Sequence, residues 1–327
     1  MNYITKSIFA ISSVLLLSTS CNKSDYDGNN NTILANNTAT LLKEFHTTPA
    51  SFSLVAGTTK ELVGPDGTFL RFYPNSFRRS DGSTINGETV NVQLSEMYSA
   101  GDMLKNYSST NTGTGVLTSG GQVFIKATVG GEEVYANKYG IGFNALRTPA
   151  SGPRALYTGN TYAAGNIVTW APGSGATGTT TTGAGPVSAA TTSSVSGSYF
   201  MFDSCTSFNW VGCYDLYSGT FQNITIKVKL ANEMFAGNVW SVVGITLPSE
   251  RVATVLYQES FDRSTQTGVY KGWAPTGTVQ RLMFLIPRDK STWYYYKTEQ
   301  LLTDGMTVNA TLIKASKDEM DAALTLF

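Results

Sequence analysis

The chain has 327 residues, of which 41% are hydrophobic and only 14% are charged, and its 23 acidic side chains balance its 23 basic ones. Globular chains carry about 25% charged residues, so this composition argues against long exposed helices and coiled coils. The balanced charge also argues against nucleic acid as a partner, because binding phosphates needs a basic surplus.

The amino terminus is typical of an export signal. Lys6 precedes a ten-residue, mostly apolar run over 8–17, and the small residues 18–20 lead directly to Cys21. This run is too short to cross a bilayer core of about 30 Å, so we predict a signal peptide over 1–20. The order resembles a bacterial lipoprotein box, although Ser18 stands where that box usually has Leu. We therefore expect Cys21 to carry a lipid; the alternative is a secreted protein with a free Cys21.

Residues 21–44 are predicted to form a flexible tether. They are polar and rich in Asn. A segment of this composition buries too little apolar surface to offset the entropy that ordering costs. We expect the folded part to begin near residue 45, held to a membrane through the lipid on Cys21.

Between residues 45 and 170 apolar and polar residues alternate with a period of two, which predicts β-strands. The alternation is clear in Val90, Val92 and Leu94, and it returns over 123–129. Gly130-Gly131 then predicts a tight hairpin into 132–136. Residues 100–107 are compatible with one or two helical turns. This spacing of strands and turns predicts an antiparallel β-sandwich domain.

A low-complexity segment follows over 171–198. Apart from Val187 and Val195 it consists of Gly, Ala, Ser, Thr and Pro, which predicts a linker or a long loop. Its Gly173-x-Gly175-x-x-Gly178 has the spacing of a dinucleotide fingerprint. The Thr-rich sequel is a poor helix, however, and the fingerprint needs a helix amino terminus to hold the pyrophosphate. We therefore expect no cofactor.

Strand patterns resume over 199–327, which we expect to form a second β domain. The clearest strand covers 224–230, and Ser316 with Glu319 has the spacing of a capping box. Apolar residues with helical spacing over 320–327 predict a short amphipathic helix that docks on this domain. The predicted fold class is mainly β, with two antiparallel β-sandwich-like domains and a short C-terminal helix.

Three segments resemble a group of uncharacterised Bacteroidota-type lipoproteins with tandem β-sandwich-like domains. They are Leu117 to Ala127, Leu156 to Gly159 with Trp170, and Phe208 to Cys213. The chain departs from the group in its additional Cys205 and in Gly212, where the group usually has Asn. The resemblance implies a lipid anchor and β-sandwich modules of unknown function.

Cys205 and Cys213 are the only pair of thiols left once Cys21 carries a lipid. Export places them where disulfides form, and a bridge needs Cα atoms within about 7 Å. One straight strand over 205–213 would separate them by roughly 26 Å, so a bridge requires the chain to turn back. The alternative is two buried thiols. The residues support the disulfide and the two buried thiols almost equally, and export favours the disulfide.

Few residues are available for catalysis. His46 is the only His, so HExxH and other two-His metal sites are excluded, and a Ser-His-Asp triad would have to recruit it. Two carboxylates could hydrolyse a glycoside, but sequence alone does not show which acids converge. We expect no enzyme and no metal site.

Aromatic side chains of the second domain are the candidate ligand-stacking residues. They are Trp273, Trp293, Tyr294, Tyr295 and Tyr296. Alternation along a strand turns two of the last four rings to each face, so some ring surface is expected outside. The alternative is that these rings fill a core.

Three functional hypotheses result. The leading one is a lipid-anchored protein of the cell envelope or surface, placed at the outer membrane, that binds a partner or acts as a scaffold. The second is a glycan-binding accessory lipoprotein, and the third is a hydrolase. The expected partners are the membrane, through the lipid on Cys21, and a polysaccharide or another envelope protein.

Overall fold

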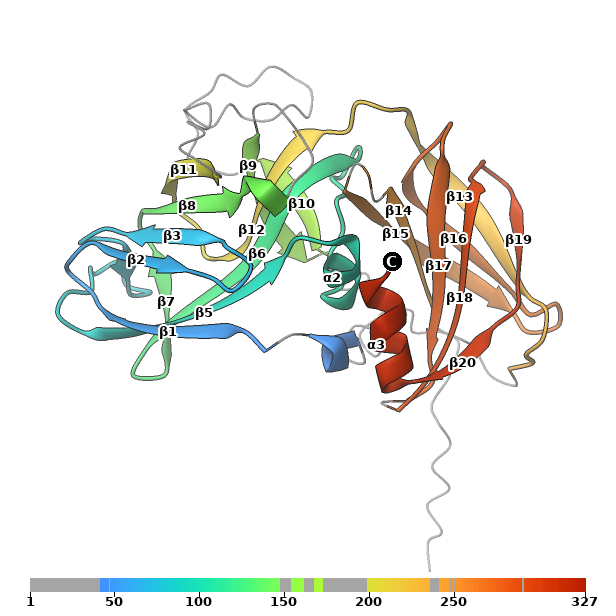
Figure 1. Cartoon of the computed structure of the whole chain (residues 1–327), viewed down its shortest axis with the longest axis horizontal. Coiled ribbons are helices and arrows are strands. Elements are labelled where there is room, and N and C mark those ends of the chain that lie inside the picture. The colour runs from blue at the N-terminus through green and yellow to red at the C-terminus, as the bar shows by residue number, and fades with distance from the viewer. Residues whose placement is uncertain are drawn as a thin grey trace, which may run out of the picture.

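The structure is a computed structural model that describes residues 42–46, 48–147, 154–161, 168–172, 199–235, 241–247, 249, 251–289 and 291–327. The predicted signal peptide, the tether up to residue 41 and residues 173–198 lie outside this part of the chain. The fold is mainly β, as predicted, and it consists of two lobes that lie side by side (Figure 1).

The N-lobe, residues 50–216, is a sandwich of two sheets. The larger sheet has the order β1-β5-β6-β12-β9-β10, and β7 joins β6 to β4. The smaller sheet has the order β11-β8-β3-β2. The strands of the larger sheet are β1 (Ala50–Val55), β4 (Phe77–Arg78), β5 (Thr89–Met97), β6 (Leu117–Val129), β7 (Glu132–Ala136), β9 (Ala155–Thr161), β10 (Val168–Pro172) and β12 (Asn209–Leu216). Those of the smaller sheet are β2 (Lys60–Val63), β3 (Phe69–Phe72), β8 (Tyr139–Asn144) and β11 (Tyr199–Cys205).

The core of the N-lobe lies between these two sheets. The predicted apolar face of β5, Val90, Val92 and Leu94, is buried against Phe72 and Ile141 of the smaller sheet. The predicted hairpin joins β6 to β7, and both glycines of its turn have positive φ, at 59° and 92°. Residues other than Gly rarely adopt this conformation, which is why a Gly-Gly pair marks the turn.

The expected domain boundary at residue 198 needs correction. β11 pairs with β8, and β12 lies between β6 and β9, so both strands belong to the N-lobe rather than to a C-terminal domain beginning at 199. The low-complexity composition of 171–198 indicated a segment without core-forming side chains. It carried no information about which sheet the next strand would join. Ala171 and Pro172 themselves belong to β10.

The C-lobe, residues 221–327, is built on one sheet that curls around its own core. The strand order is β19-β13-β16-β15-β14-β17-β18-β20, and every pair is antiparallel except β13 with β19. The strands are β13 (Phe221–Leu230), β14 (Val242–Leu247), β15 (Val252–Asp262), β16 (Thr267–Pro275), β17 (Val279–Pro287), β18 (Thr292–Leu301), β19 (Thr307–Ala310) and β20 (Ile313–Ser316).

The two edges of this sheet are held together by one continuous piece of chain. β19 pairs with β13 at one edge and β20 pairs with β18 at the other. Only three residue steps separate Ala310 from Ile313, and such a stretch spans at most about 11 Å. The sheet must therefore curl, and Ile224, Ile226 and Val228 point into the space that it encloses.

The predicted C-terminal helix is confirmed as α3 (Lys317–Thr325). Its capping box is complete: the Ser316 hydroxyl accepts from the Glu319 backbone N–H, and the Glu319 carboxylate accepts from the Ser316 N–H at 2.8 Å. The buried face of α3 covers the outer side of the C-lobe sheet. The 3-10 helix η1 (Lys43–Phe45) packs there as well, and Leu42 is fully buried, so the predicted tether ends before residue 42.

A seam of direct contacts fixes the lobes to each other. The short helix α2 (Ala100–Lys105) of the N-lobe lies against α3 of the C-lobe, and both occupy the middle of Figure 1. The buried Lys105 ammonium reaches Asp321 at 2.7 Å and the Thr325 hydroxyl at 2.8 Å. A Cβ atom at Gly101 would collide with the Leu324 carbonyl oxygen. Close helix contact at this point therefore depends on glycine.

Backbone hydrogen bonds extend the seam. The Thr110 N–H donates to the Ala253 carbonyl at 2.6 Å, and the Ser119 N–H donates to the Arg251 carbonyl at 3.1 Å. The Arg251 guanidinium donates to the Tyr98 carbonyl at 2.7 Å.

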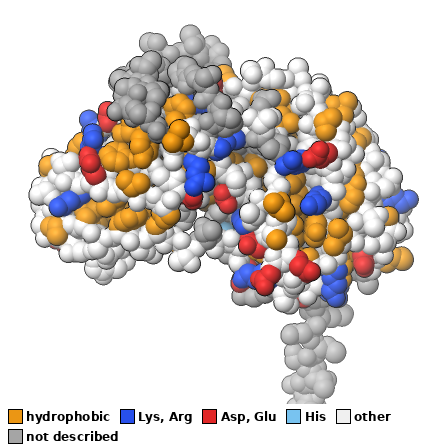
Figure 2. All heavy atoms as spheres, in the orientation of Figure 1, with side chains coloured by type: hydrophobic (Ala, Val, Ile, Leu, Met, Phe, Trp, Pro, Cys, Tyr) orange, Lys and Arg blue, Asp and Glu red, His pale blue; other side chains and the backbone are white. Residues whose placement is uncertain are grey.

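On the face shown in Figure 2, acidic and basic side chains of the described residues are intermixed over both lobes. No helix within the described residues is long and apolar enough to cross a membrane.

We predict that Gly101→Ala destabilises the protein by about 1–3 kcal/mol, because the added methyl group overpacks the α2–α3 contact. Denaturant unfolding of the Cys21→Ser protein measures the change. Gly113→Ala is the matched control, since a Cβ atom there meets nothing within 4 Å. The control should stay within about 1 kcal/mol of the parent. Equal losses in the two variants would contradict this account of the seam.

We also predict that cutting the chain between β10 and β11 does not separate two domains. A specific protease site placed within residues 180–185 should give two fragments on a denaturing gel after cleavage. The fragments should co-elute in native size-exclusion chromatography, because β11 and β12 remain hydrogen-bonded to β8, β6 and β9. Elution as two separate species would restore a domain boundary at this segment.

Candidate functional site

A pocket of about 300 Å³ lies where the two lobes meet, and we call it the junction pocket. Its N-lobe wall consists of residues 111–113 and Thr169 of β10. Its C-lobe floor is formed by side chains of β13, β15 and β16, namely Asn223, Tyr257, Glu259, Lys271 and Trp273. Ligand sites occur preferentially at such interfaces between folded units, so this pocket is the candidate site.

Strand register explains why the floor residues lie together. Asn223 of β13 is paired with Trp273 of β16, and Lys271 of β16 is paired with Tyr257 of β15. Directly opposed residues project from the same face with Cβ atoms about 4.5–5.5 Å apart, and residues two apart on one strand share that face. This pairing places four side chains side by side on the outer face of the C-lobe sheet: the amide of Asn223, the indole of Trp273, the ammonium group of Lys271 and the phenol of Tyr257.

Trp273 is held in place but not covered. Its ring packs edge to face on Phe221, with ring centroids 5.8 Å apart and an interplanar angle of 67°. The pair lies against a small apolar cluster to which Val116 of the N-lobe and Val252 of the C-lobe contribute. Because the indole is only partly buried, it retains ring surface toward the pocket.

Asn111 supplies the polar wall. It is only 4% exposed, and its backbone is fixed on both sides: its N–H donates to the Ser109 hydroxyl at 3.2 Å, and its carbonyl accepts from the Trp170 N–H at 3.0 Å. The side-chain Oδ1 accepts no hydrogen bond from any described residue. Leaving a buried acceptor unsatisfied costs about 1–3 kcal/mol, which a ligand donor would recover.

The charged groups of the floor nearly balance each other. Lys271 Nζ lies 3.8 Å from Glu259 Oε1, and both side chains are about half exposed. Such a pair contributes little to stability, so both groups can turn toward a ligand at small cost. Trp273 is predicted as a candidate from the sequence, whereas Asn111, Tyr257 and Lys271 are not. No local signal marks them, because only the pairing of distant segments brings them together.

The structure corrects the prediction for Trp293 and Tyr294. Trp293 is fully buried and packs edge to face on Phe45, with ring centroids 4.7 Å apart. Tyr294, on the other face of β18, is 8% exposed and packs on Phe235. Alternation does divide the rings between two faces, but α3 and η1 cover the outer face of the sheet at Trp293.

Tyr295 and Tyr296 are partly buried. They pack against the apolar clusters on the two sides of β18, and neither lines the junction pocket. Of the five predicted aromatics, only Trp273 therefore lies in the candidate site.

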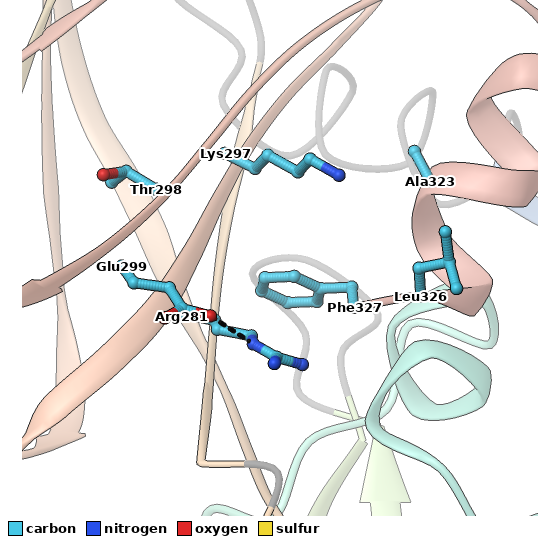
Figure 3. A pocket seen from close by; sticks show the side chains of 7 residues that line it. All are labelled: Arg281, Lys297, Thr298, Glu299, Ala323, Leu326 and Phe327. Atoms are coloured by element: carbon cyan, nitrogen blue, oxygen red, sulfur yellow. Dashed lines mark hydrogen bonds and ion pairs between the residues drawn. The ribbon is translucent and has the colours of Figure 1, made fainter.

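A second hollow, of about 340 Å³, lies between α3 and the strands β17 and β18, and we call it the terminal pocket. Figure 3 shows Lys297 extending from β18 toward α3, and Arg281 paired with Glu299. The Arg281 Nε–Glu299 Oε1 distance is 2.8 Å. Lys297 and Arg281 line this pocket together with Leu326 and Phe327 at the carboxyl end of α3, where positive charge is favourable.

Cys205 and Cys213 are free, buried thiols, so the structure has the alternative of two buried thiols rather than the disulfide that export favoured. The chain does turn between them, but it passes from β11 in one sheet to β12 in the other. The Cys205 thiol lies 3.1 Å from the Tyr139 hydroxyl. Burial raises the pKa of both thiols. Cys21 lies outside the described residues.

Other candidate groups have structural roles or remain dispersed. Glu96 is buried and accepts from the Asp66 and Thr68 N–H groups at 2.9 and 2.7 Å, so it organises the turn before β3. His46 is exposed beside η1. Within the described ranges, His, Cys, Asp and Glu side chains do not cluster in threes as metal ligands would.

Comparison with known proteins gives no assignment. No known family matches the chain, and no curated protein matches it in sequence. The candidate site therefore rests on the geometry of the junction pocket.

We predict two free thiols per chain in unfolded, unreduced Cys21→Ser protein. In the folded protein both should react slowly with a thiol reagent at neutral pH, because they are buried and their raised pKa values keep the thiolate fraction low. Spectrophotometric titration before and after unfolding gives both values. Absence of free thiols after unfolding would show that Cys205 and Cys213 are bridged.

Proposed function

We propose that this chain is an exported lipoprotein that is anchored to the cell envelope through Cys21 and acts as a non-catalytic binding module. The observation that carries the proposal is the junction pocket. It combines a partly exposed indole with a buried acceptor that has no partner among the described residues, and residues of both lobes line it. Small-molecule sites have this composition, with apolar ring surface and a few placed polar groups.

The proposed anchor follows from the sequence. A short apolar run and small residues precede Cys21, and the resemblance to Bacteroidota-type lipoproteins supports an envelope location at the outer membrane. Twenty residues separate Cys21 from the buried Leu42, and a stretch of this length reaches at most about 70 Å. The junction pocket would therefore work near the membrane that holds the lipid.

The pocket lining supports binding rather than hydrolysis. Glycoside hydrolysis by the common mechanisms uses two carboxyl groups, about 5–9.5 Å apart. Among the described residues that line the junction pocket, Glu259 is the only one with a carboxylate, and it lies beside Lys271. Glycan binding is the second candidate function, and Trp273 is the observation that favours it.

Fractionation tests the anchor. In the bacterial host, Cys21→Ser should move the protein from the membrane fraction to the soluble fraction, because the thiol that takes the lipid is gone. Ser20→Ala, which keeps a small residue before the Cys, is the matched control and should stay with the membrane. Retention of Cys21→Ser in the membrane fraction after a high-salt wash would contradict the lipid anchor.

Binding is tested separately with the soluble protein. A screen against envelope and host polysaccharides, and against peptides, should find a ligand whose binding is lost when Thr169→Trp fills the junction pocket. A ligand that binds Thr169→Trp as well as the parent would place the binding site elsewhere.

A further inference from the structure

We infer that the junction pocket is a carbohydrate subsite that holds a neutral pyranose ring, with one ring face on Trp273 and a hydroxyl donating to Asn111 Oδ1. The inference rests on the proposed function, because it names the ligand class of the same pocket. It depends on three features of the lining: an apolar plane, a fixed acceptor and a balanced pair of charges.

Trp273 provides the apolar plane. One face of a pyranose ring presents C–H groups, which pack on the face of an aromatic ring, while its hydroxyls point outward around the rim. The contact with Phe221 fixes the orientation of the indole, so little side-chain freedom is left to lose when a ligand binds. A rigid aromatic platform of this kind suits a flat, semi-polar ring better than a flexible chain.

Asn111 provides the fixed acceptor. Its Oδ1 is unpartnered among the described residues, and the hydrogen bonds to Ser109 and Trp170 hold its backbone in place. A sugar hydroxyl is both a donor and an acceptor, so it can satisfy Oδ1 and still accept from a second group. Thr112 and Asn223 line the same pocket with a further hydroxyl and amide.

The charges of the pocket indicate a neutral ligand. Lys271 is the only cationic residue among the described residues of the lining, and its Nζ lies 3.8 Å from Glu259 Oε1, so neither sign dominates there. A phosphate or a carboxylate that is attracted by Lys271 would also be repelled by Glu259. The volume of about 300 Å³ is at the lower end of ligand pockets, roughly 300–1,000 Å³, which fits one ring or two.

Saturation-transfer-difference NMR tests this inference with Cys21→Ser protein. The probes are methyl glycosides of glucose, galactose and mannose and free N-acetylglucosamine, each at millimolar concentration. At least one should show transfer concentrated on the C–H groups of one ring face. Trp273→Ala should weaken its binding about tenfold or more. Tyr135→Ala is the control, since Tyr135 is an exposed ring on β7 outside the pocket, and it should leave binding unchanged.

Asn111→Leu separates a ligand contact from a structural role. Removing a buried, unpartnered acceptor should leave the melting temperature unchanged or higher, while binding of the same glycoside falls about tenfold. Asn111→Asp keeps an acceptor oxygen at the same position and should retain more of the binding than Asn111→Leu. A loss of melting temperature in parallel with the loss of binding would assign Asn111 to structure and overturn its role.

Further probes distinguish failure of this inference from failure of the proposed function. Galacturonate binding more tightly than any neutral glycoside would overturn the neutral assignment. Trp273-dependent binding of a random hexapeptide mixture, without transfer to any glycoside, would overturn the carbohydrate class and keep the pocket as a binding site. Absence of transfer to every probe, with no effect of Thr169→Trp on any ligand of the screen, would overturn both.

Discussion

The close contact between α2 and α3 is the constraint on which the arrangement of the lobes depends. Because Gly101 has no side chain, the α2 backbone can approach the Leu324 carbonyl, and this approach brings Lys105 within reach of Asp321. A buried ammonium group is costly unless it is paired, and here the partner comes from the other lobe. Asn111 follows Lys105 by six residues, so the same contact places one wall of the junction pocket opposite its floor.

Local patterns predicted the elements of this fold well. The alternation over 90–94 and over 224–230 marks one strand face that is buried in each lobe, and such alternation depends only on neighbours in the sequence. The Ser316–Glu319 capping box is confirmed for the same reason, since its hydrogen bonds span three residues. The fold class, mainly β with a short terminal helix, follows from these local signals.

The features that the sequence does not predict are those that depend on contacts between elements far apart in the chain. The pattern of β18 separates Trp293 from Tyr294, but the burial of Trp293 depends on α3 and η1, which cover the sheet from outside. Which sheet β11 and β12 join depends on partner strands about 55 to 100 residues away along the chain. The described residues that line the junction pocket come from five segments between 111 and 273. Of these residues, only Trp273 is predicted from the sequence, because its large aromatic side chain marks it as a candidate.

β19, β20 and α3 follow the other strands of the C-lobe in chain order, which has a consequence for folding during synthesis. Synthesis from the amino terminus completes the N-lobe strands before residues 307–327 are made. Until those residues emerge, β13 and β18 are unpaired edges, and α2 lacks the helix it packs against. Open strand edges are prone to aggregation, so the C-lobe sheet is protected only once β19 and β20 have paired with these edges. A premature stop codon directly after β18 would therefore leave both C-lobe edges open and remove the helix that α2 packs against.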